Sequence, residues 1–143
     1  MIFRPPRTVH CNTCDCCIRN FDHHCLWLGT CIGARNYLAF LCYITLLNIA
    51  LPIVSMQAIR AILELLEETE PSSVGYASAI GFYALTTVCI NVLVLVLFVF
   101  HIYLLCVNQT TYESVKNLLG RFPLVPNPNH LGNFFSNLRA RAR

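Results

Sequence analysis

Charged residues are scarce in this sequence, and two long stretches lack them almost entirely. Of the 143 residues, 12% are charged, which is about half the fraction of an average soluble protein. No charged residue lies between Tyr37 and Ile59, and between Pro71 and Tyr112 the ionisable side chains are His101, two cysteines and tyrosines. A helix needs about 20 apolar residues to cross a bilayer. This composition excludes an ordinary soluble domain and predicts an integral membrane protein.

Basic residues are missing from the segment between the two apolar stretches. Residues 62–78 contain four glutamates and no Lys or Arg, whereas nine of the ten Lys and Arg residues lie before the first stretch or after the second. Because basic residues accumulate on the cytosolic side of membranes, we expect both ends in the cytosol and the acidic segment in the lumen or outside. A basic tail can also bind nucleic acid, but two membrane spans argue against such a partner here.

The chain therefore divides into five segments. Residues 1–36 form a cytosolic cysteine-rich module, 37–61 a transmembrane helix, 62–78 a lumenal or extracellular loop, 79–107 a second transmembrane helix, and 108–143 a cytosolic tail. The predicted fold is an all-α integral membrane protein with two transmembrane helices, preceded by a small loop-rich zinc-binding module. Polar groups inside membranes usually face another helix, so we expect Asn91 to form an interhelical hydrogen bond.

Cysteine is abundant, and six of the nine cysteines lie within residues 11–31. A disulfide framework would suit a secreted chain, but the cytosol is reducing, so these residues are candidate metal ligands or reactive thiols. Zinc takes four thiolate and imidazole ligands in a tetrahedron. One complete set can be drawn: Cys11, Cys14, His24 and Cys31. His10 and Cys17 are then left as half of a second site.

The run Asp22-His23-His24-Cys25 contains more reactive groups than one metal site needs. Alternate residues of an extended chain share a side, so His23 and Cys25 would face together and away from His24. With His24 on the metal, His23 can take a proton from Cys25 while Asp22 orients the imidazole. The alternative makes Cys25 another zinc ligand, although the complete set already has four members without it.

These motifs together resemble the cysteine-rich domain of the DHHC-type protein S-acyltransferases, or palmitoyltransferases. The resemblance rests on Arg4-Pro5-Pro6-Arg7, His10-Cys11-x-x-Cys14-x-x-Cys17, Asp22-His23-His24-Cys25 with Trp27, Cys31-Ile32-Gly33 with Asn36, and Thr110-Thr111-Tyr112-Glu113 after the second apolar stretch. It covers essentially the whole chain in the right order. The sequence departs from the family at Leu26, where proline is usual, at Thr30, and at Asn129, where an aromatic residue is usual.

The resemblance also implies parts of the enzyme that this sequence does not contain. The family has two further transmembrane helices and a Cys-x-x-Cys upstream of the cysteine-rich domain. We therefore expect the chain to be a fragment of a four-helix membrane enzyme, and inactivity of this chain alone would be consistent with that expectation.

In such an enzyme the resemblance implies that Cys25 is the nucleophile, His23 its base and Asp22 the residue that orients the base. It implies one zinc on the four-ligand set above, and a second zinc shared by His10 and Cys17 with the upstream Cys-x-x-Cys. Two further implications concern the acid and the acyl chain. Thr111 would lie near Asp22, and an acyl cavity between the transmembrane helices would have a mouth lined by Trp27, Phe40 and Tyr43.

The implied function is protein S-palmitoylation at the membrane surface. Acyl-CoA, the co-substrate, has a charged head in the cytosol and a chain in the bilayer, and Arg4 and Arg7 could attract its phosphates. The partners would be membrane-associated proteins with cytosolic cysteines, in the Golgi, the endoplasmic reticulum or the plasma membrane, with the active site facing the cytosol. The alternative is a catalytically inactive, membrane-anchored zinc-binding scaffold.

The charge pattern makes a direct prediction about topology. In sealed microsomes, added protease should remove epitope tags fused to either end of the chain, because both ends are expected on the cytosolic face. A tag inserted between residues 70 and 71 should be protected until detergent opens the vesicles. Protected terminal tags beside a cleaved internal tag would invert the topology.

Overall fold

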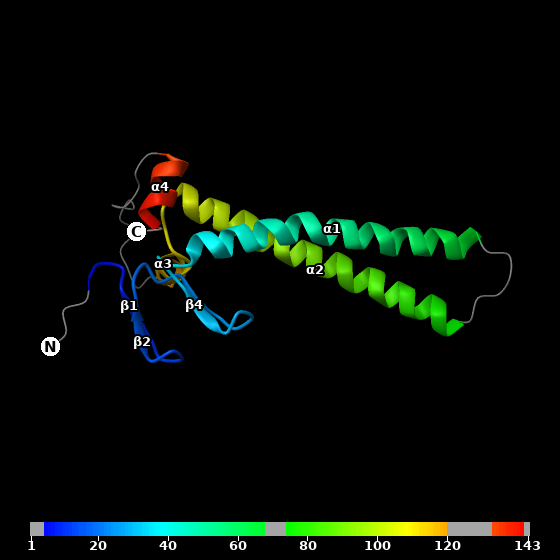
Figure 1. Cartoon of the computed structure of the whole chain (residues 1–143), viewed down its shortest axis with the longest axis horizontal. Helices are drawn as coiled ribbons and strands as arrows, with labels where there is room; N and C mark the ends of the chain where they lie inside the picture. Colours follow the sequence, from blue (N-terminus) through cyan, green and yellow to red (C-terminus); the bar gives the residue numbers. More distant parts are fainter. Residues whose placement is uncertain (1–4, 68–73, 120–132, 142–143) are drawn as a thin grey trace. The chain divides into compact units, whose positions relative to one another are not determined.

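The computed structural model describes residues 5–67, 74–119 and 133–141 (Figure 1). The chain falls into two compact units, one made of residues 1–42 and 100–143 and the other of Tyr43–Val99. The two long helices each run through both units. Arg4 and Asn129, which the sequence analysis singled out, lie outside the described residues.

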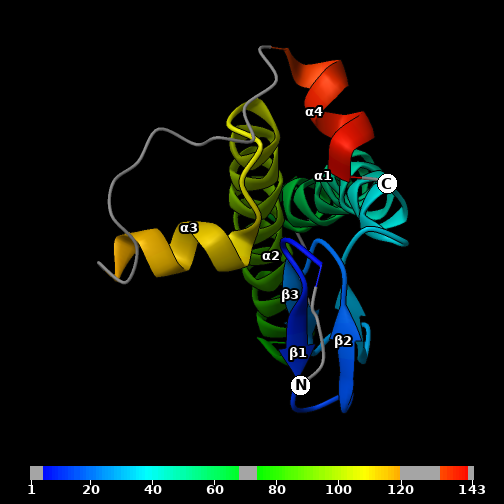
Figure 2. The same cartoon turned by 90° about the vertical axis from the view of Figure 1, so that its left-hand side faces the viewer.

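Two short antiparallel hairpins build the cysteine-rich module. Strand β1 (Val9–Cys11) pairs with β2 (Cys16–Ile18), and β3 (His23–Cys25) pairs with β4 (Thr30–Ile32). Each pair is joined by four residues, of which the last has a left-handed backbone, with φ 49° at Asp15 and 61° at Gly29. Figure 2 shows β1 and β2 side by side. The sequence analysis predicted loops here, because three-residue strands are too short to show an alternating pattern.

The two hairpins are also alike in sequence and register. The pattern His-Cys, five residues, Cys-Ile occurs at His10 and again at His24. The pairing of His10 with Cys17 across the first hairpin corresponds to the pairing of His24 with Cys31 across the second. The module is therefore an internal repeat of one hairpin, which the sequence analysis did not predict.

Gly33 lies where the exits of the two hairpins approach each other. The Ala34 amide donates to the Arg19 carbonyl at 3.0 Å, which holds the two exits together. A Cβ atom at Gly33 would lie 2.6 Å from Ile18 Cγ2 and 2.9 Å from the Arg19 carbonyl oxygen. Glycine is required at this position because a backbone atom cannot move aside as a flexible side chain can.

The two long helices are α1 (Tyr37–Glu67) and α2 (Val74–Cys106). Both are long and apolar enough to cross a membrane, with mean hydropathies of 2.1 and 2.7. The expected fold class, two membrane helices after a small cysteine-rich module, is confirmed. Helix α1 continues to Glu67 and α2 begins at Val74, beyond the predicted limits at residues 61 and 79. The residues added at the end of α1 are mainly glutamate and leucine, which favour helix.

Polar side chains join the two helices inside the second unit. Asn91 of α2 donates from Nδ2 to Ser55 Oγ of α1 at 2.6 Å, and Asn48 Nδ2 lies 3.4 Å from the Val94 carbonyl oxygen. The interhelical hydrogen bond expected of Asn91 is confirmed. Such bonds contribute roughly 0.6–2 kcal/mol each in a bilayer.

The described residues of the first unit also include two short helices, α3 (Thr111–Leu118), which follows the end of α2, and α4 (Phe134–Arg141). Asn137 of α4 donates from Nδ2 to the carbonyl oxygens of Leu105 and Cys106 at 3.0 and 3.1 Å. The last carbonyl groups of a helix have no partner within it, so Asn137 binds the end of α2.

The close approach at Gly33 can be tested by adding one methyl group. Gly33→Ala should destabilise the module by about 1–3 kcal/mol, because the Arg19 backbone or Ile18 must shift to admit the methyl group. Thermal unfolding in detergent would measure the loss. Gly81→Ala in α2 is the matched control, since no atom lies within 4 Å of the added Cβ; an equal loss in both variants would contradict the steric account.

Candidate functional site

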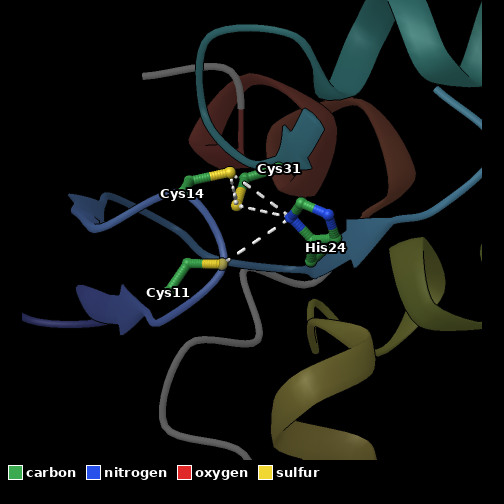
Figure 3. A group of neighbouring side chains, drawn as sticks. All are labelled: Cys11, Cys14, His24 and Cys31. Carbon is green, nitrogen blue, oxygen red and sulfur yellow. Dashed lines mark hydrogen bonds between the residues drawn. The ribbon is translucent and has the colours of Figure 1, made fainter. Parts of the chain in front are cut away.

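Four side chains from the two hairpins converge on one point. The cluster, here called the metal cluster, consists of Cys11, Cys14, His24 and Cys31. Figure 3 shows the His24 ring directed at the three sulfur atoms. His24 Nδ1 lies 3.3 Å from Cys14 Sγ, 3.6 Å from Cys31 Sγ and 3.7 Å from Cys11 Sγ. The arrangement can hold a metal ion.

The cluster has the size of a tetrahedral site. With metal–sulfur bonds of about 2.3 Å and metal–nitrogen bonds of about 2.0 Å, ligand atoms lie about 3.5–3.8 Å apart. The sulfur atoms of Cys14 and Cys31 are 3.4 Å apart. Burial, with hydrogen bonds to Cys11 and Cys14, raises the pKa of the Cys31 thiol to about 12. A cation among the thiols would offset the repulsion between neighbouring thiolates.

The second group of functional side chains surrounds the carboxylate of Asp22, which is 1% exposed. Its Oδ2 accepts hydrogen bonds from His23 Nδ1 at 2.8 Å and from the Thr111 hydroxyl at 2.6 Å. Its Oδ1 accepts from the Thr111 amide at 3.1 Å and from Arg141 Nη2 at 2.7 Å. Both oxygens of this acid are thus fully occupied.

These contacts decide the ionisation of Asp22. Burial disfavours the charged carboxylate, but the hydrogen bond from His23, the Arg141 charge and the hydrogen bonds from Thr111 outweigh it and lower the pKa to about 2. A carboxylate can only accept hydrogen bonds, so the proton between Asp22 and His23 lies on His23 Nδ1. In a neutral imidazole the other nitrogen, Nε2, is then the proton acceptor.

The Thr110-Thr111-Tyr112-Glu113 motif is the start of α3, and it explains why Thr111 reaches Asp22. Thr110 is the N-cap: its hydroxyl accepts from the Glu113 amide, while the Glu113 carboxylate accepts from the Thr110 amide, which makes a capping box. The first free amide of the helix, that of Thr111, points at the Asp22 carboxylate. Helix N-termini favour negative charge, so α3 stabilises the ionised acid.

Arg7 holds the chain before β1 against the same motif. Its Nε and Nη2 donate to the two carboxylate oxygens of Glu113, each at 2.8 Å, and Nη2 also donates to the Asn108 carbonyl at 3.1 Å. This fork geometry is the strong form of an Arg–carboxylate pair. Arg7 has a partner within the chain, and its contact with CoA phosphates stays a prediction.

Aromatic and polar side chains at the ends of the two long helices lie close to the His23 ring. The Phe40 ring centroid lies 5.3 Å from that of His23 and 4.9 Å from that of His101. His101 is 1% exposed, and its Nδ1 lies 3.3 Å from the Tyr37 hydroxyl. Asp22, His23 and His101 also form a second group of potential metal ligands. The Arg141 charge on Asp22 opposes a cation there, so we interpret Asp22 and His23 as a hydrogen-bonded pair and His101 as a neighbour of that pair.

The other described residues that the sequence analysis proposed for the site lie outside the metal cluster and make no hydrogen bond with the Asp22 carboxylate among those described here. Cys25 ends β3, is 7% exposed and is not a member of the metal cluster. Cys17 Sγ lies 3.9 Å from His10 Nδ1 on the exposed first hairpin. Trp27, in the turn of the second hairpin, is 98% exposed, and Tyr43 belongs to the second unit.

Sequence reasoning missed two residues of this site, His101 and Arg141. His101 was noted only as a polar residue in an apolar stretch, and Arg141 only as one positive charge in the tail. A signal for Arg141 was present, because it lies four residues after Asn137 and therefore on the same face of a helix. That signal needs the helix α4 to be recognised first.

Comparison with known proteins identifies the family to which the chain belongs. The family described as DHHC palmitoyltransferase matches residues 1–118. This chain belongs to the DHHC palmitoyltransferase family. The matched region contains both hairpins, both long helices and α3, so the DHHC family resemblance of the sequence is confirmed over all the elements except α4.

Individual DHHC relatives match nearly the whole chain. Probable protein S-acyltransferase 2 of Arabidopsis thaliana is 39% identical over 146 residues, covering 96% of this chain and 33% of that protein. Palmitoyltransferase ZDHHC9 of Homo sapiens is 37% identical, covering 95% and 38%, and palmitoyltransferase ZDHHC14 of Mus musculus is 35% identical, covering 95% and 28%. The chain spans about a third of the length of these relatives.

Proposed function

We propose that this chain forms the catalytic part of a protein S-acyltransferase that uses acyl-CoA. The observation that carries the proposal is the hydrogen bond between Asp22 and His23. His23 lies two residues before Cys25, a cysteine that is not a member of the metal cluster. The names of the relatives, palmitoyltransferase and protein S-acyltransferase, support a long-chain acyl group as the group transferred.

The proposed reaction is a double thioester exchange. His23 Nε2 takes the proton of the Cys25 thiol, and the thiolate attacks the carbonyl carbon of acyl-CoA. A carbon–sulfur bond to Cys25 forms, the bond to CoA breaks, and His23 returns the proton to the departing CoA thiolate. A cysteine of a membrane-associated protein then attacks acyl-Cys25 in the same way. Both steps convert one thioester into another, so positioning and a base are the main requirements.

The chemistry of the metal cluster supports zinc as its ion. Three thiolates and one imidazole form a common closed zinc set, and such closed sites serve structure rather than catalysis. Bound zinc would supply folding energy and hold the two hairpins together. Strand alternation then turns His24 towards the metal and leaves His23 and Cys25 on the other side.

Acyl-CoA and the membrane-associated protein substrate would both reach the site at the membrane surface. We propose that α1 and α2 span an endomembrane or the plasma membrane, with the cysteine-rich module at the cytosolic surface. Trp27, Phe40 and Tyr43 remain the proposed contacts of the acyl chain: Phe40 packs on the His23 ring, and the exposed Trp27 is available to lipid or acyl chain. The phosphates of CoA would be attracted by Arg4.

The zinc assignment predicts about one metal ion per chain. His24→Ala should lose it and unfold the module, because an emptied structural site forfeits its metal-linked folding energy. His10→Ala is the matched control from the equivalent position of the first hairpin and should keep the zinc. Metal analysis of the purified proteins measures both. Two zinc ions per chain, one of them lost in His10→Ala, would mean that the first hairpin completes a site of its own.

The catalytic assignment predicts a different pattern in acyl labelling. Cys25→Ser should abolish a hydroxylamine-sensitive label from radioactive acyl-CoA while zinc is retained. His23→Ala should slow labelling roughly 10²–10⁴-fold, the usual contribution of a positioned base, again with zinc retained. Labelling is measured in membranes with the protein that contains this chain. Loss of zinc in Cys25→Ser, with zinc kept in His24→Ala, would make Cys25 the ligand and favour the inactive scaffold.

A further inference from the structure

Arg141, the last described residue of α4, has one of the most buried side chains of the first unit. It is 1% exposed, and its guanidinium carbon lies 4.1 Å from the centroid of the Tyr37 ring. Nη2 donates to Asp22 Oδ1 and to the Gln109 carbonyl oxygen, both at 2.7 Å. Burying a guanidinium is costly unless it is paired. An arginine that only attached α4 to the surface would not need to reach the acid of the Asp22–His23 pair.

Helix α4 is held so that Arg141 meets Asp22 at a fixed place. One turn earlier, Asn137 binds the carbonyl groups at the end of α2. At the C-terminal end of α4, Asn20 Nδ2 lies 3.3 Å from the Ala140 carbonyl oxygen and 3.4 Å from that of Arg141. Asn20 is two residues before Asp22, so the segment that carries the acid also binds the end of the helix that carries the arginine.

The division of hydrogen bonds over the Asp22 carboxylate shows what Arg141 adds. Oδ2 serves His23 and the Thr111 hydroxyl, whereas Oδ1 is held by Arg141 and the Thr111 amide. Without Arg141, the only hydrogen bond left to Asp22 Oδ1 among those described here would be the one from the Thr111 amide, at 3.1 Å. The carboxylate could then rotate about its Cβ–Cγ bond, and Oδ2 would move away from His23 Nδ1.

We propose that Arg141 is a positioning residue for acyl transfer, which acts by holding the Asp22 carboxylate in the orientation in which Oδ2 accepts the hydrogen bond from His23 Nδ1. His23 Nε2 then stays directed at its proton-transfer partner. This inference rests on the proposed function. It makes the attachment of α4 a condition for an ordered Asp22–His23 pair, so the tail helix contributes to the active site although it touches no substrate.

Substitutions of two arginines on one helix test the role. Arg141→Met keeps most of the apolar volume and removes the hydrogen bonds, and it should slow self-acylation of Cys25 roughly 10- to 100-fold, as misplacement of a catalytic group does. Arg141→Lys should recover part of the rate, because an ammonium can pair with a carboxylate but lacks the planar fork. Arg139→Met, on the exposed side of α4, is the control and should keep the wild-type rate and zinc content.

A double-mutant cycle separates action through Asp22 from a general effect on stability. If Arg141 acts through Asp22, adding Arg141→Met to Asp22→Asn should slow acylation no further. Zinc content and monodispersity are measured in each variant. Losses that multiply in the double variant, or a wild-type rate in Arg141→Met, would overturn the proposal.

A spectroscopic measurement tests the same inference without acyl transfer. With ¹⁵N-labelled histidine, the His23 signal, identified by its absence in His23→Ala, should report a proton fixed on Nδ1 in the wild type and in Arg139→Met. Arg141→Met should lose this fixed tautomer. If the wild type fails to acylate, the proposed function falls, while the His23 signal still decides the role of Arg141; an unchanged signal in Arg141→Met would refute it.

Discussion

The metal cluster is the constraint on which the first unit of this protein depends. Its ligands come in pairs from the two hairpins, Cys11 and Cys14 from the first, His24 and Cys31 from the second. Three-residue strands with a largely exposed first hairpin bury little apolar surface, so a bound cation is the interaction that can hold them. The same cluster fixes the side to which His24 faces. By strand alternation it thereby determines which side is left for His23 and Cys25.

The orientation of the Asp22 carboxylate depends largely on elements that lie far away along the chain. The carboxylate is bound by His23 from β3, by Thr111 at the start of α3 and by Arg141 at the end of α4. The capping box of α3 serves this purpose, because it sets the helix start so that the Thr111 amide and hydroxyl meet the acid. A buried, ionised carboxylate that is hydrogen-bonded on both oxygens cannot change orientation without breaking several contacts. The Asp22–His23 pair is therefore held by its surroundings rather than by its own strand.

The sequence carried the parts of this structure that depend on local pattern. Apolar length predicted both long helices, and Cys/His spacing gave the ligand set that the structure brings together as the metal cluster. The two hairpins were not predicted, because a strand of three residues is too short to show an alternation of apolar and polar residues in the sequence. The repeated pattern at His10 and His24 was nevertheless a usable signal. Arg141 was not predicted because its partner is 119 residues away. Unless helix α4 is recognised first, nothing distinguishes it from Arg139, which is exposed two residues earlier.

The central claim is that His24 binds the metal and Cys25 does not. X-ray absorption at the zinc edge tests it most directly, because sulfur and nitrogen neighbours scatter differently and lie at about 2.3 and 2.0 Å. The account predicts three sulfur atoms and one imidazole nitrogen around the zinc of the wild-type protein, with the same spectrum in Cys25→Ser. Four sulfur neighbours in the wild type, falling to three in Cys25→Ser, would put Cys25 on the metal and contradict the account.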